Sequence, residues 1–408
     1  MRIAYLTTQY PAISHTFVDR EVRQLRSQGV DVHTFSVRLP HDHDLLSDAH
    51  REAHRTTTYL LASKPKMMLS QLPAFIMAPA GYFGVMWRAL LLSPEGLRNH
   101  LLYLVYAMQG VVLARHLKER GIAHVHVHLA NNGAAVAMLA CVYDPSLTYS
   151  LTIHGSSVFF AAEQWRLKEK AENAAFVRCI SNFTRAQVMF WTDPVAWEKF
   201  HVVHCGVDTK TFSPRPDHAN GPLRLITVGR LDPIKGYSLL LDALKRLDDM
   251  VVGWHLNMIG DGDLMDKLRS QSQRYGLADQ ITFTGAIGQD RLQDHLIAAD
   301  VMIISSFMEG LPVVLMEAMS SQLAVISTNV AGVAELVEHD RSGLVVPAGS
   351  AEALADAIRE LATDRTRMNA MGRHGRKKVV SEFSVELAGR QMVELFRHYA
   401  GDAVLADV

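Results

Sequence analysis

The sequence predicts an α/β protein of two domains, each built on a parallel β-sheet with helices on both faces. Strand and helix signals alternate along both halves, and the strands read as continuous apolar runs, as strands buried on both faces do. A chain of 408 residues also exceeds the size at which one core usually stops growing. We therefore predict a first domain over 1–212, a linker over 213–222, a second domain over 223–381 and a terminal helix over 382–408.

The first half opens with a strand, a helix and a strand, and the pattern resumes after an apolar insert. Strands are predicted at 2–6, 31–37, 122–127, 148–153 and 175–180, and helices at 16–28, at 131–142 and from Asn182 onward. The loop between the first strand and the first helix contains Ser14 and His15. Ser14 is suited to capping the helix that follows, which is one of two interpretations of this residue.

The second half repeats the alternation after the linker, whose sequence SPRPDHANGP is rich in proline, glycine and polar residues. Strands are predicted at 223–228, 254–259 and 280–284, and helices at 237–249, 263–275 and 289–299. A further apolar run, ADVMIISS, reads as another buried strand.

That last strand leads into a turn of Glu309, Gly310, Leu311 and Pro312, and Pro312 is predicted to be the first residue of a helix. The N-terminus of such a helix offers unpaired N–H groups and the positive end of its dipole, which together attract phosphate. Glu309 lies at the mouth of this corner and Glu317 lies inside the helix. Carboxylates beside an anion site need polar partners such as sugar hydroxyls, so the corner predicts a sugar-nucleotide site.

A second segment supplies positive charge. In VGRLDPIKG a strand ends at Gly229, and Arg230 and Lys235 follow in a short loop before the next helix. The planar guanidinium and the mobile ammonium group can both bind a diphosphate. Each could equally be an ordinary solvated cation, but together with the acidic corner downstream they favour a diphosphate site.

Composition excludes several classes of protein. The net charge is −1, so nothing attracts nucleic acid globally, and the three cysteines are isolated, which suits reduced thiols rather than disulfides or zinc. The N-terminus enters a strand directly without a signal-peptide core, so we expect a cytoplasmic protein.

The insert at about 60–115 is apolar and predicted to be helical. Its stretch over 67–87 carries no charged residue and is about long enough to span a bilayer, although Pro73 and Pro79 break it. Three interpretations stay open: a membrane span, a cover over the protein's own core, or docking at a lipid surface, which suits a peripheral membrane protein.

Two patterns suggest metal, and neither predicts a site. His124, His126 and His128 alternate along one face of a strand, where ligands about 7 Å apart cannot close a tetrahedron. Asp232 and the GDGDL segment have no fitting context for magnesium, and neither GDGDL nor GRLDPIKG completes a dinucleotide or P-loop motif. We predict no metal and no cofactor.

The motifs VGRLDPIKG, IGDGDLMDKL and EGLPVVLME, with AGVAELVEHDRSGLVVPAGSAEALADAI, resemble the retaining GT-B glycosyltransferases of family 4. YPAISHTFVDREVRQLRSQG, HVHVHL, SLTIHGSSVF, CISNFTRAQV and VVHCGVDTKTFSP extend the resemblance over roughly residues 1 to 385, toward the branch that acts in bacterial exopolysaccharide synthesis. The resemblance implies two Rossmann-like domains facing each other across a cleft, with the terminal helix crossing back to the first.

The resemblance also implies roles. Glu317 would bind the ribose, the amides of Gly310 and Leu311 and the helix at Pro312 would hold the diphosphate, and Glu309 and His154 would contact the donor sugar. Arg230 and Lys235 would neutralise the leaving diphosphate in place of a metal, and the loop with Ser14 and His15 would approach donor and acceptor.

The function that follows is transfer of a hexose, with retention, from a UDP- or GDP-sugar to a lipid-linked oligosaccharide. A sugar-nucleotide 2-epimerase of related fold and a non-catalytic assembly partner remain as alternatives. Sugar, base, linkage and oligomeric state are not predicted.

Overall fold

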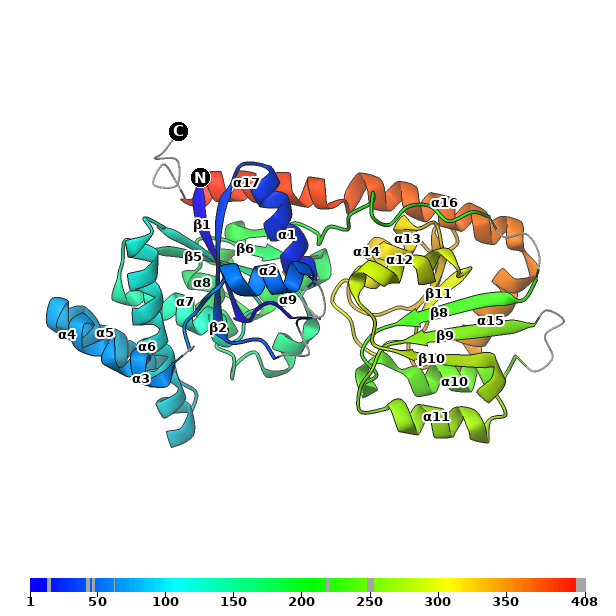
Figure 1. Cartoon of the computed structure of the whole chain (residues 1–408), viewed down its shortest axis with the longest axis horizontal. Helices are drawn as coiled ribbons and strands as arrows, with labels where there is room; N and C mark the ends of the chain where they lie inside the picture. Colours follow the sequence, from blue (N-terminus) through cyan, green and yellow to red (C-terminus); the bar gives the residue numbers. More distant parts are fainter. Residues whose placement is uncertain are drawn as a thin grey trace. The chain divides into compact units, whose positions relative to one another are not determined.

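The computed structural model describes residues 1–12, 16–41, 45, 48–61, 63–217, 221–247 and 253–400. The chain forms two compact units (Figure 1). The first comprises Met1–His204 together with the chain from Ala388 onward, and the second comprises Cys205–Leu387.

The first unit is built on a seven-stranded parallel sheet of order β3-β2-β1-β4-β5-β6-β7. Its strands are β1 (Arg2–Gln9), β2 (Asp31–Arg38), β3 (Thr58–Tyr59), β4 (His124–His128), β5 (Thr148–Ile153), β6 (Val177–Cys179) and β7 (Phe200–Val202). The helices are α1 (Thr16–Ser27), α2 (Asp48–Thr56), α3 (Lys64–Leu69), α4 (Gln71–Met77), α5 (Pro79–Leu92), α6 (Leu97–Glu119), α7 (Asn132–Tyr143), α8 (Leu167–Asn173) and α9 (Asn182–Trp191), with 3-10 turns η3 (Ser156–Ala161) and η4 (Pro194–Lys199). The five predicted strands are all present, and β3 and β7 are short strands that the prediction missed.

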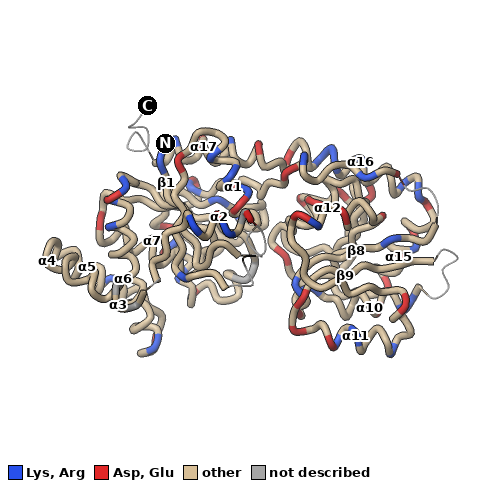
Figure 2. Tube along the Cα trace, viewed as in Figure 1, with Lys and Arg blue, Asp and Glu red and all other residues tan. Residues whose placement is uncertain are grey.

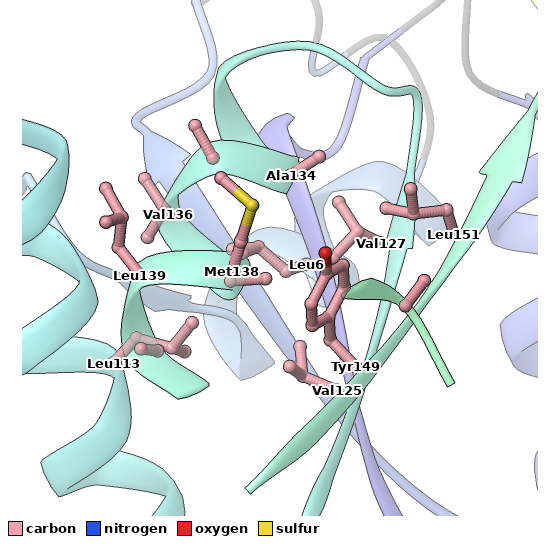
Figure 3. Packing of buried hydrophobic residues seen from close by; sticks show 14 of the residues in the cluster. Leu6, Leu113, Val125, Val127, Ala134, Val136, Met138, Leu139, Tyr149 and Leu151 are labelled. Atoms are coloured by element: carbon pink, nitrogen blue, oxygen red, sulfur yellow. The ribbon is translucent and has the colours of Figure 1, made fainter. Parts of the chain in front are cut away.

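The core of this unit lies between the sheet and helices α6 and α7 (Figure 3). Val125 and Leu151 of the strands and Leu139 of α7 belong to this cluster, and all three are fully buried. A Cβ at Gly110 of α6 would lie 2.9 Å from the backbone nitrogen of Ala140. The two helices therefore pack with their backbones close together, which anchors the helices of the 60–115 segment to the core.

Helix α17 (Val385–Ala400) packs in the first unit through its residues from Ala388 onward. Met392 and Phe396 are fully buried in a second apolar cluster with Tyr5 of β1 and Val22 of α1. This is the packing that the resemblance implied for the terminal helix.

The second unit is built on a six-stranded parallel sheet of order β10-β9-β8-β11-β12-β13. Its strands are β8 (Leu223–Val228), β9 (Trp254–Ile259), β10 (Ile281–Gly285), β11 (Val301–Ile304), β12 (Ala324–Thr328) and β13 (Gly343–Val346). The helices are α10 (Tyr237–Lys245), α11 (Met265–Arg274), α12 (Gln289–Ile297), α13 (Val313–Ser320), α14 (Val333–Leu336), α15 (Ala351–Thr363) and α16 (Arg365–Glu382), with turns η5 (Pro233–Lys235) and η6 (Ala278–Gln280).

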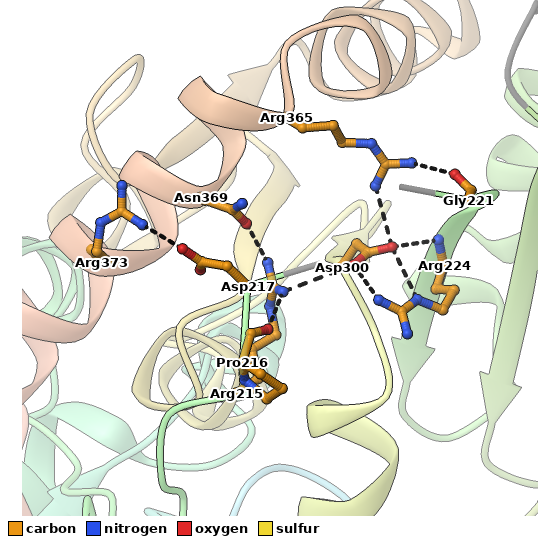
Figure 4. Close-up of polar contacts among 9 residues, drawn as sticks. All are labelled: Arg215, Pro216, Asp217, Gly221, Arg224, Asp300, Arg365, Asn369 and Arg373. Atoms are coloured by element: carbon orange, nitrogen blue, oxygen red, sulfur yellow. Dashed lines mark hydrogen bonds and ion pairs between the residues drawn. The ribbon is translucent and has the colours of Figure 1, made fainter. Parts of the chain in front are cut away.

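Part of the predicted linker belongs to this second unit. Arg215 is 3% exposed. Its Nη1 lies 3.8 Å from Asp300 Oδ1, and its Nη2 donates to Asn369 Oδ1 of α16 (Figure 4). Because this segment is anchored by buried polar contacts, the division between the units falls after His204, earlier in the chain than the predicted boundary at residue 212.

Among the described residues, no helix is both long enough and apolar enough to cross a bilayer.

Candidate functional site

The predicted corner lies between β11 and α13, at the carboxyl edge of the second sheet. Pro312 precedes the helix and is not its first residue, so that detail of the prediction was wrong: its ψ of 109° is extended, and α13 begins at Val313. Pro312 provides no side-chain cap for the first turn of α13. Glu317 lies inside the helix, as predicted, and the carbonyl of Gly310 accepts a hydrogen bond from the amide of Gly332 at 3.0 Å.

Lys235 and Glu309 form the centre of this site. The Lys235 Nζ donates to Glu309 Oε1 at 2.7 Å, and the Ser306 hydroxyl donates to the same oxygen at 2.6 Å. Glu309 is 9% exposed, so this carboxylate is nearly buried and holds two donors. Thr328 fixes the strand end from the far side, because its hydroxyl donates to the carbonyl of Ser306 at 2.6 Å.

The loop that carries Lys235 is locked to the strand end that precedes Glu309. Strands β8 and β11 are neighbours in the sheet, so the loops that follow them meet. The Ser305 hydroxyl donates to the carbonyls of Lys235 and Gly236, and the Phe307 amide donates to the carbonyl of Ile234 at 2.8 Å. Gly236 has a φ of 65°, and a Cβ there would lie 2.1 Å from the carbonyl oxygen of Ser305, so only glycine fits.

Arg230 takes a different partner from Lys235. Its guanidinium pairs with Asp232, with N···O distances of 2.8 and 2.7 Å, and its side chain is 79% exposed. The other oxygen of Asp232 accepts from the amide of Ile234 and caps η5. Lys235 is therefore tied to the acidic corner, whereas Arg230 stands at the surface of the loop.

Glu317 is buried at 3% exposure, and its Oε1 accepts a hydrogen bond from Gln289 Nε2 at 2.8 Å. Gln289 is the first residue of α12. No local sequence pattern predicts this contact, because the two helices are separate in the chain and a glutamine at a helix start is common.

The GDGDL segment has a structural role that the sequence reading missed. Gly229 has a φ of 156°, and a Cβ on Gly260 would lie 1.9 Å from the carbonyl oxygen of Gly229. The Leu231 amide donates to the carbonyl of Asp261 at 2.9 Å. The segment thus supports the loop that carries Arg230 and Lys235 through close backbone packing.

A small recess opens beside the ion pair. Its lining is Thr227, Val228, Lys235, Tyr237, Ile304, Ser305, Ser306 and Glu309. Burial, followed by the nearby charge of Glu309, raises the pKa of Tyr237 well above its ordinary value. Tyr237 is therefore a neutral phenol beside the acidic corner at physiological pH.

His154 lies in the first unit, just after β5. Its Nε2 is 2.7 Å from Nδ1 of His128, and the Phe17 ring lies against it with centroids 4.1 Å apart. His124 and His126 are fully buried, and among the described residues their ring nitrogens bond to the hydroxyls of Thr148, Ser150 and Thr152.

One group of described residues has ligand atoms close enough together for a metal ion: Glu21, His126 and His128, within 4.8 Å of one another. The Glu21 carboxylate already pairs with the guanidinium of Arg178, and both ring nitrogens of His126 face hydroxyls. The positive charge of Arg178, which is already paired with the one carboxylate of this group, repels a metal cation at that position. Absence of metal in the protein stays a prediction.

Ser14 and His15, the predicted donor and acceptor loop, lie outside the described residues.

Comparison with known proteins defines the class. Residues 208–378 match the profile of the glycosyl transferases group 1, and residues 89–211 match that of glycosyltransferase family 4. The chain therefore contains a glycosyl transferases group 1 domain and a glycosyltransferase family 4 domain, as its motifs indicated.

Particular relatives lie in polysaccharide and glycolipid synthesis. The chain is 32% identical over 57% of its length to a GDP-mannose-dependent phosphatidylinositol monomannoside mannosyltransferase of Mycobacterium tuberculosis, covering 64% of that protein. It is 35% identical over 49% of its length to the putative colanic acid biosynthesis glycosyltransferase WcaL of Escherichia coli, covering 51% of it. The amylovoran biosynthesis glycosyltransferase AmsK of Erwinia amylovora aligns along its entire length at 26% identity, over 98% of this chain.

Two solved structures share the fold. Sucrose-phosphate synthase of Thermosynechococcus elongatus superposes with a TM-score of 0.76 at 21% identity, covering 98% of this chain and 99% of that one. HepE of Anabaena in complex with UDP-glucose superposes with a TM-score of 0.74 at 18% identity, covering 98% of this chain and 100% of that one. The two parallel sheets are thus the paired Rossmann-like domains of the GT-B class.

Proposed function

We propose that this glycosyltransferase moves a hexose, with retention of configuration, from a nucleoside diphosphate sugar to a hydroxyl of a lipid-linked oligosaccharide in exopolysaccharide synthesis. The observation that carries the donor assignment is the Lys235–Glu309 pair with Ser306 at the end of β11, directly before the N-terminus of α13. A cation, a nearly buried carboxylate and a helix N-terminus at one strand edge match a diphosphate joined to a sugar.

Each group has a distinct part. The amides of Gly310 and Leu311 and the first turn of α13 hold the diphosphate, and Lys235 and Arg230 stabilise the charge that develops on it as it leaves. Lys235 exchanges Glu309 for phosphate oxygens, and this exchange releases the Glu309 carboxylate to accept hydrogen bonds from the donor sugar. Glu317, held by Gln289, accepts from the ribose hydroxyls.

Retention is proposed through attack from the face of the leaving group, with the departing phosphate oxygen taking the acceptor's proton. His154 contacts the donor sugar in this scheme. Lys235, Arg230 and the helix N-terminus supply the positive charge that a metal provides in other transferases, so the reaction needs no divalent cation.

The relatives support the pathway but leave the donor's base open. WcaL is a putative colanic acid biosynthesis glycosyltransferase and AmsK an amylovoran biosynthesis glycosyltransferase. The mycobacterial mannosyltransferase depends on GDP-mannose, and HepE has been solved in complex with UDP-glucose. UDP and GDP sugars are therefore the donors to test first.

The deciding experiment is calorimetric titration of the purified protein with UDP, GDP, ADP and their sugar conjugates, with and without EDTA. One diphosphate should bind, and EDTA should leave its affinity unchanged. Loss of binding in EDTA would contradict the metal-free scheme, and absence of binding by every nucleotide to the folded protein would contradict the donor site.

The alternative functions differ in their products. An epimerase keeps the nucleotide attached to the sugar, and an assembly partner turns over nothing. Release of free nucleoside diphosphate that depends on an added lipid-linked acceptor therefore supports the transferase and excludes both.

We further propose that the helices of the insert dock on an anionic membrane surface, where a lipid-linked acceptor resides. Many of their large apolar side chains are exposed: Met68, Leu69, Leu72, Phe75, Ile76, Met77, Phe83, Trp87, Leu91, Leu97, Leu101 and Leu102. Met77 is 82% exposed and Trp87 is 64% exposed. Many exposed large apolar side chains on neighbouring helices are typical of interfacial binding.

The excess of basic residues in the insert favours an anionic lipid surface as the binding partner of its exposed apolar side chains. Helices α4 and α5 carry almost no charge (Figure 2), and over 60–115 the basic residues outnumber the single acid, Glu95. These basic residues are Lys64, Lys66, Arg88, Arg98 and Arg115. Basic residues next to an anionic surface contribute about 1 kcal/mol each.

Flotation with phosphatidylglycerol-containing vesicles tests the docking face. A variant with Leu72, Ile76, Met77, Phe83 and Trp87 changed to serine should no longer float with the vesicles. A matched control replaces Phe190 and Val195, which are equally exposed elsewhere on the same unit, and it should float like the wild type. Unchanged flotation of the first variant, or a concentration-dependent dimer that this variant abolishes, would overturn the proposal.

A further inference from the structure

A buried chain of charged and polar groups leads to His154 from inside the first unit. It runs from Arg178 on β6 to Glu21 on α1, then to His128 at the end of β4, and from there to His154 after β5. Arg178 and His128 are completely buried, and the Glu21 side chain is 8% exposed. Buried charges are costly, so a chain of this kind requires an explanation in terms of what it holds in place.

Glu21 is the fixed negative charge of this chain. Burial alone would raise its pKa, but Arg178 and then His128 hold the pKa of the Glu21 carboxyl well below its usual value. The Tyr5 hydroxyl also donates to Glu21 Oε1 at 2.7 Å. Arg178 is itself fixed, because it donates to the backbone carbonyls of Val203 and His204 at 2.9 and 2.8 Å.

The carboxylate determines the proton position on His128. Nε2 of His128 lies 3.5 Å from Glu21 Oε1 and has no hydrogen-bond partner among the described residues. A negative charge at this distance favours the tautomer with the proton on Nε2. Nδ1 of His128 is then the acceptor, and Nε2–H of His154 donates to it across 2.7 Å.

Helix α1 also holds the plane of the His154 ring. Phe17, one helical turn before Glu21, lies against the His154 ring at a tilt, with centroids 4.1 Å apart and an interplanar angle of 33°. The His128 ring stacks on His154 as well, with centroids 5.0 Å apart. One helix therefore fixes both the ring plane, through Phe17, and the proton, through Glu21 and His128.

We infer that Glu21 and His128 are positioning residues that hold His154 as the tautomer protonated on Nε2, with its Nδ1 as the acceptor nitrogen. This inference rests on the proposed function, in which His154 contacts the donor sugar. It adds that a sugar hydroxyl donates to Nδ1 of His154. It also adds that the Glu21 carboxylate, acting through His128, determines which ring nitrogen of His154 carries the proton.

The tautomer is measured directly by long-range nitrogen–proton NMR of histidine-labelled protein, with His154 assigned from a His154→Gln variant. The wild type should carry the His154 proton on Nε2, and Glu21→Gln should shift the population toward the other tautomer. A wild-type proton on Nδ1 would overturn the inference, whatever reaction the enzyme catalyses.

Kinetics give the second readout. His128→Leu removes the acceptor and should lower kcat about a hundred-fold with nucleotide affinity unchanged, because a misplaced contact to the reacting sugar affects the chemical step. His128→Asn restores an acceptor near the Nδ1 position and should recover most of that loss. The matched control is His124→Leu, a change at a buried histidine on the same strand whose ring nitrogens bond to the hydroxyls of Thr148 and Ser150.

If His128→Leu and His124→Leu lower kcat equally, in proportion to their loss of stability, the positioning role is wrong. If the wild type releases no nucleoside diphosphate while the spectra show the expected tautomer, the proposed function fails and the tautomer assignment stands.

Discussion

Lys235 and Glu309 are 74 positions apart in the chain, and the Lys235 Nζ lies 2.7 Å from Glu309 Oε1. In the protein without substrate, each group neutralises the other in a partly buried setting. Under the proposed function, binding of a diphosphate sugar replaces this ion pair with hydrogen bonds from Lys235 to phosphate and from the sugar to Glu309. We therefore expect the pair to couple phosphate binding to sugar binding.

Removing either partner should lower turnover. Lys235→Met and Glu309→Gln should each reduce kcat by about 10²–10³, because each removes a preorganised group from the transition state. The double variant should lose less than the product of the single losses, since the two groups act as one unit. Steady-state kinetics with Lys267→Met, an exposed lysine on α11, as the control checks this. Multiplicative losses would contradict the coupling.

Glu317→Ala should weaken nucleotide affinity with little change in kcat. A charged hydrogen bond to ribose is worth about 1.5–3 kcal/mol, or roughly ten- to a hundred-fold in Kd. Gln289→Ala should act in the same direction but less, because Gln289 only orients Glu317. Calorimetric titration measures both. Gln293→Ala, one turn further along α12, is the control, and equal affinities in all three variants would refute the ribose assignment.

Lys170 should give the protein a pH-dependent stability. Burial lowers the pKa of Lys170 from 10.5 to about 7, and its Nζ donates to the carbonyls of Ala130 and Asn131. Between pH 7 and 10.5 the unfolded chain binds the proton that the folded one releases. The stability from this group is therefore present above pH 10.5 and is lost as the pH falls toward 7.

Urea denaturation at several pH values tests the Lys170 prediction. The free energy of unfolding of the wild type, relative to Lys170→Met, should rise with pH above 7 by roughly 1 kcal/mol per unit. Lys168→Met, at an exposed lysine two residues earlier, should run parallel to the wild type. A difference between wild type and Lys170→Met that is constant across pH would show that Lys170 keeps an ordinary pKa.

Asp300→Asn should destabilise the second unit strongly. Asp300 is 1% exposed and lies among three arginines (Figure 4). It accepts hydrogen bonds from the backbone amide and the guanidinium of Arg224 and from Arg365 at 3.3 Å. The buried guanidinium of Arg215 lies 3.8 Å from it. Removing the negative charge takes the buried carboxylate away from the buried guanidinium of Arg215, which costs roughly 3–5 kcal/mol in free energy of unfolding.

The control for Asp300 is Asp217→Asn, which removes a surface pair with Arg373 at 2.9 Å. Exposed pairs contribute at most about 1 kcal/mol, so this variant should unfold near the wild-type denaturant midpoint. Equal midpoints for the two variants would mean that the buried cluster adds no stability.

The sequence predicted the fold because strands buried on both faces read as unbroken apolar runs, and the turns that follow them carry glycine and proline. It also predicted where Lys235, Glu309 and Glu317 lie relative to the strands and helices. Lys235 and Glu309 follow strands, Glu317 lies in the helix after the turn, and each of these elements has a local signal. Pro312 was assigned one position too far into its helix, since the transition from extended to helical backbone depends on how α13 packs.

The groups that sequence reasoning missed act across the chain. Glu21 reads as one more polar residue of an amphipathic helix, and Arg178 as a charge inside a short apolar strand, yet their carboxylate and guanidinium meet in the interior. Gln289 and Asp300 carry no local signal either. Gly260 needs to be glycine because its φ is 140° and because the backbone of Gly229 lies against it.

The sequence by itself determined most of the strands and helices and indicated the candidate site residues, because periodicity, turn chemistry and helix starts are local properties of the chain. Only the tertiary structure decided which side chains meet: Lys235 with Glu309, Gln289 with Glu317, and Glu21 with Arg178 and His128. The reason is physical. Pairing and burial of charges depend on which strands become neighbours in a sheet, and that order is set by packing of the whole domain.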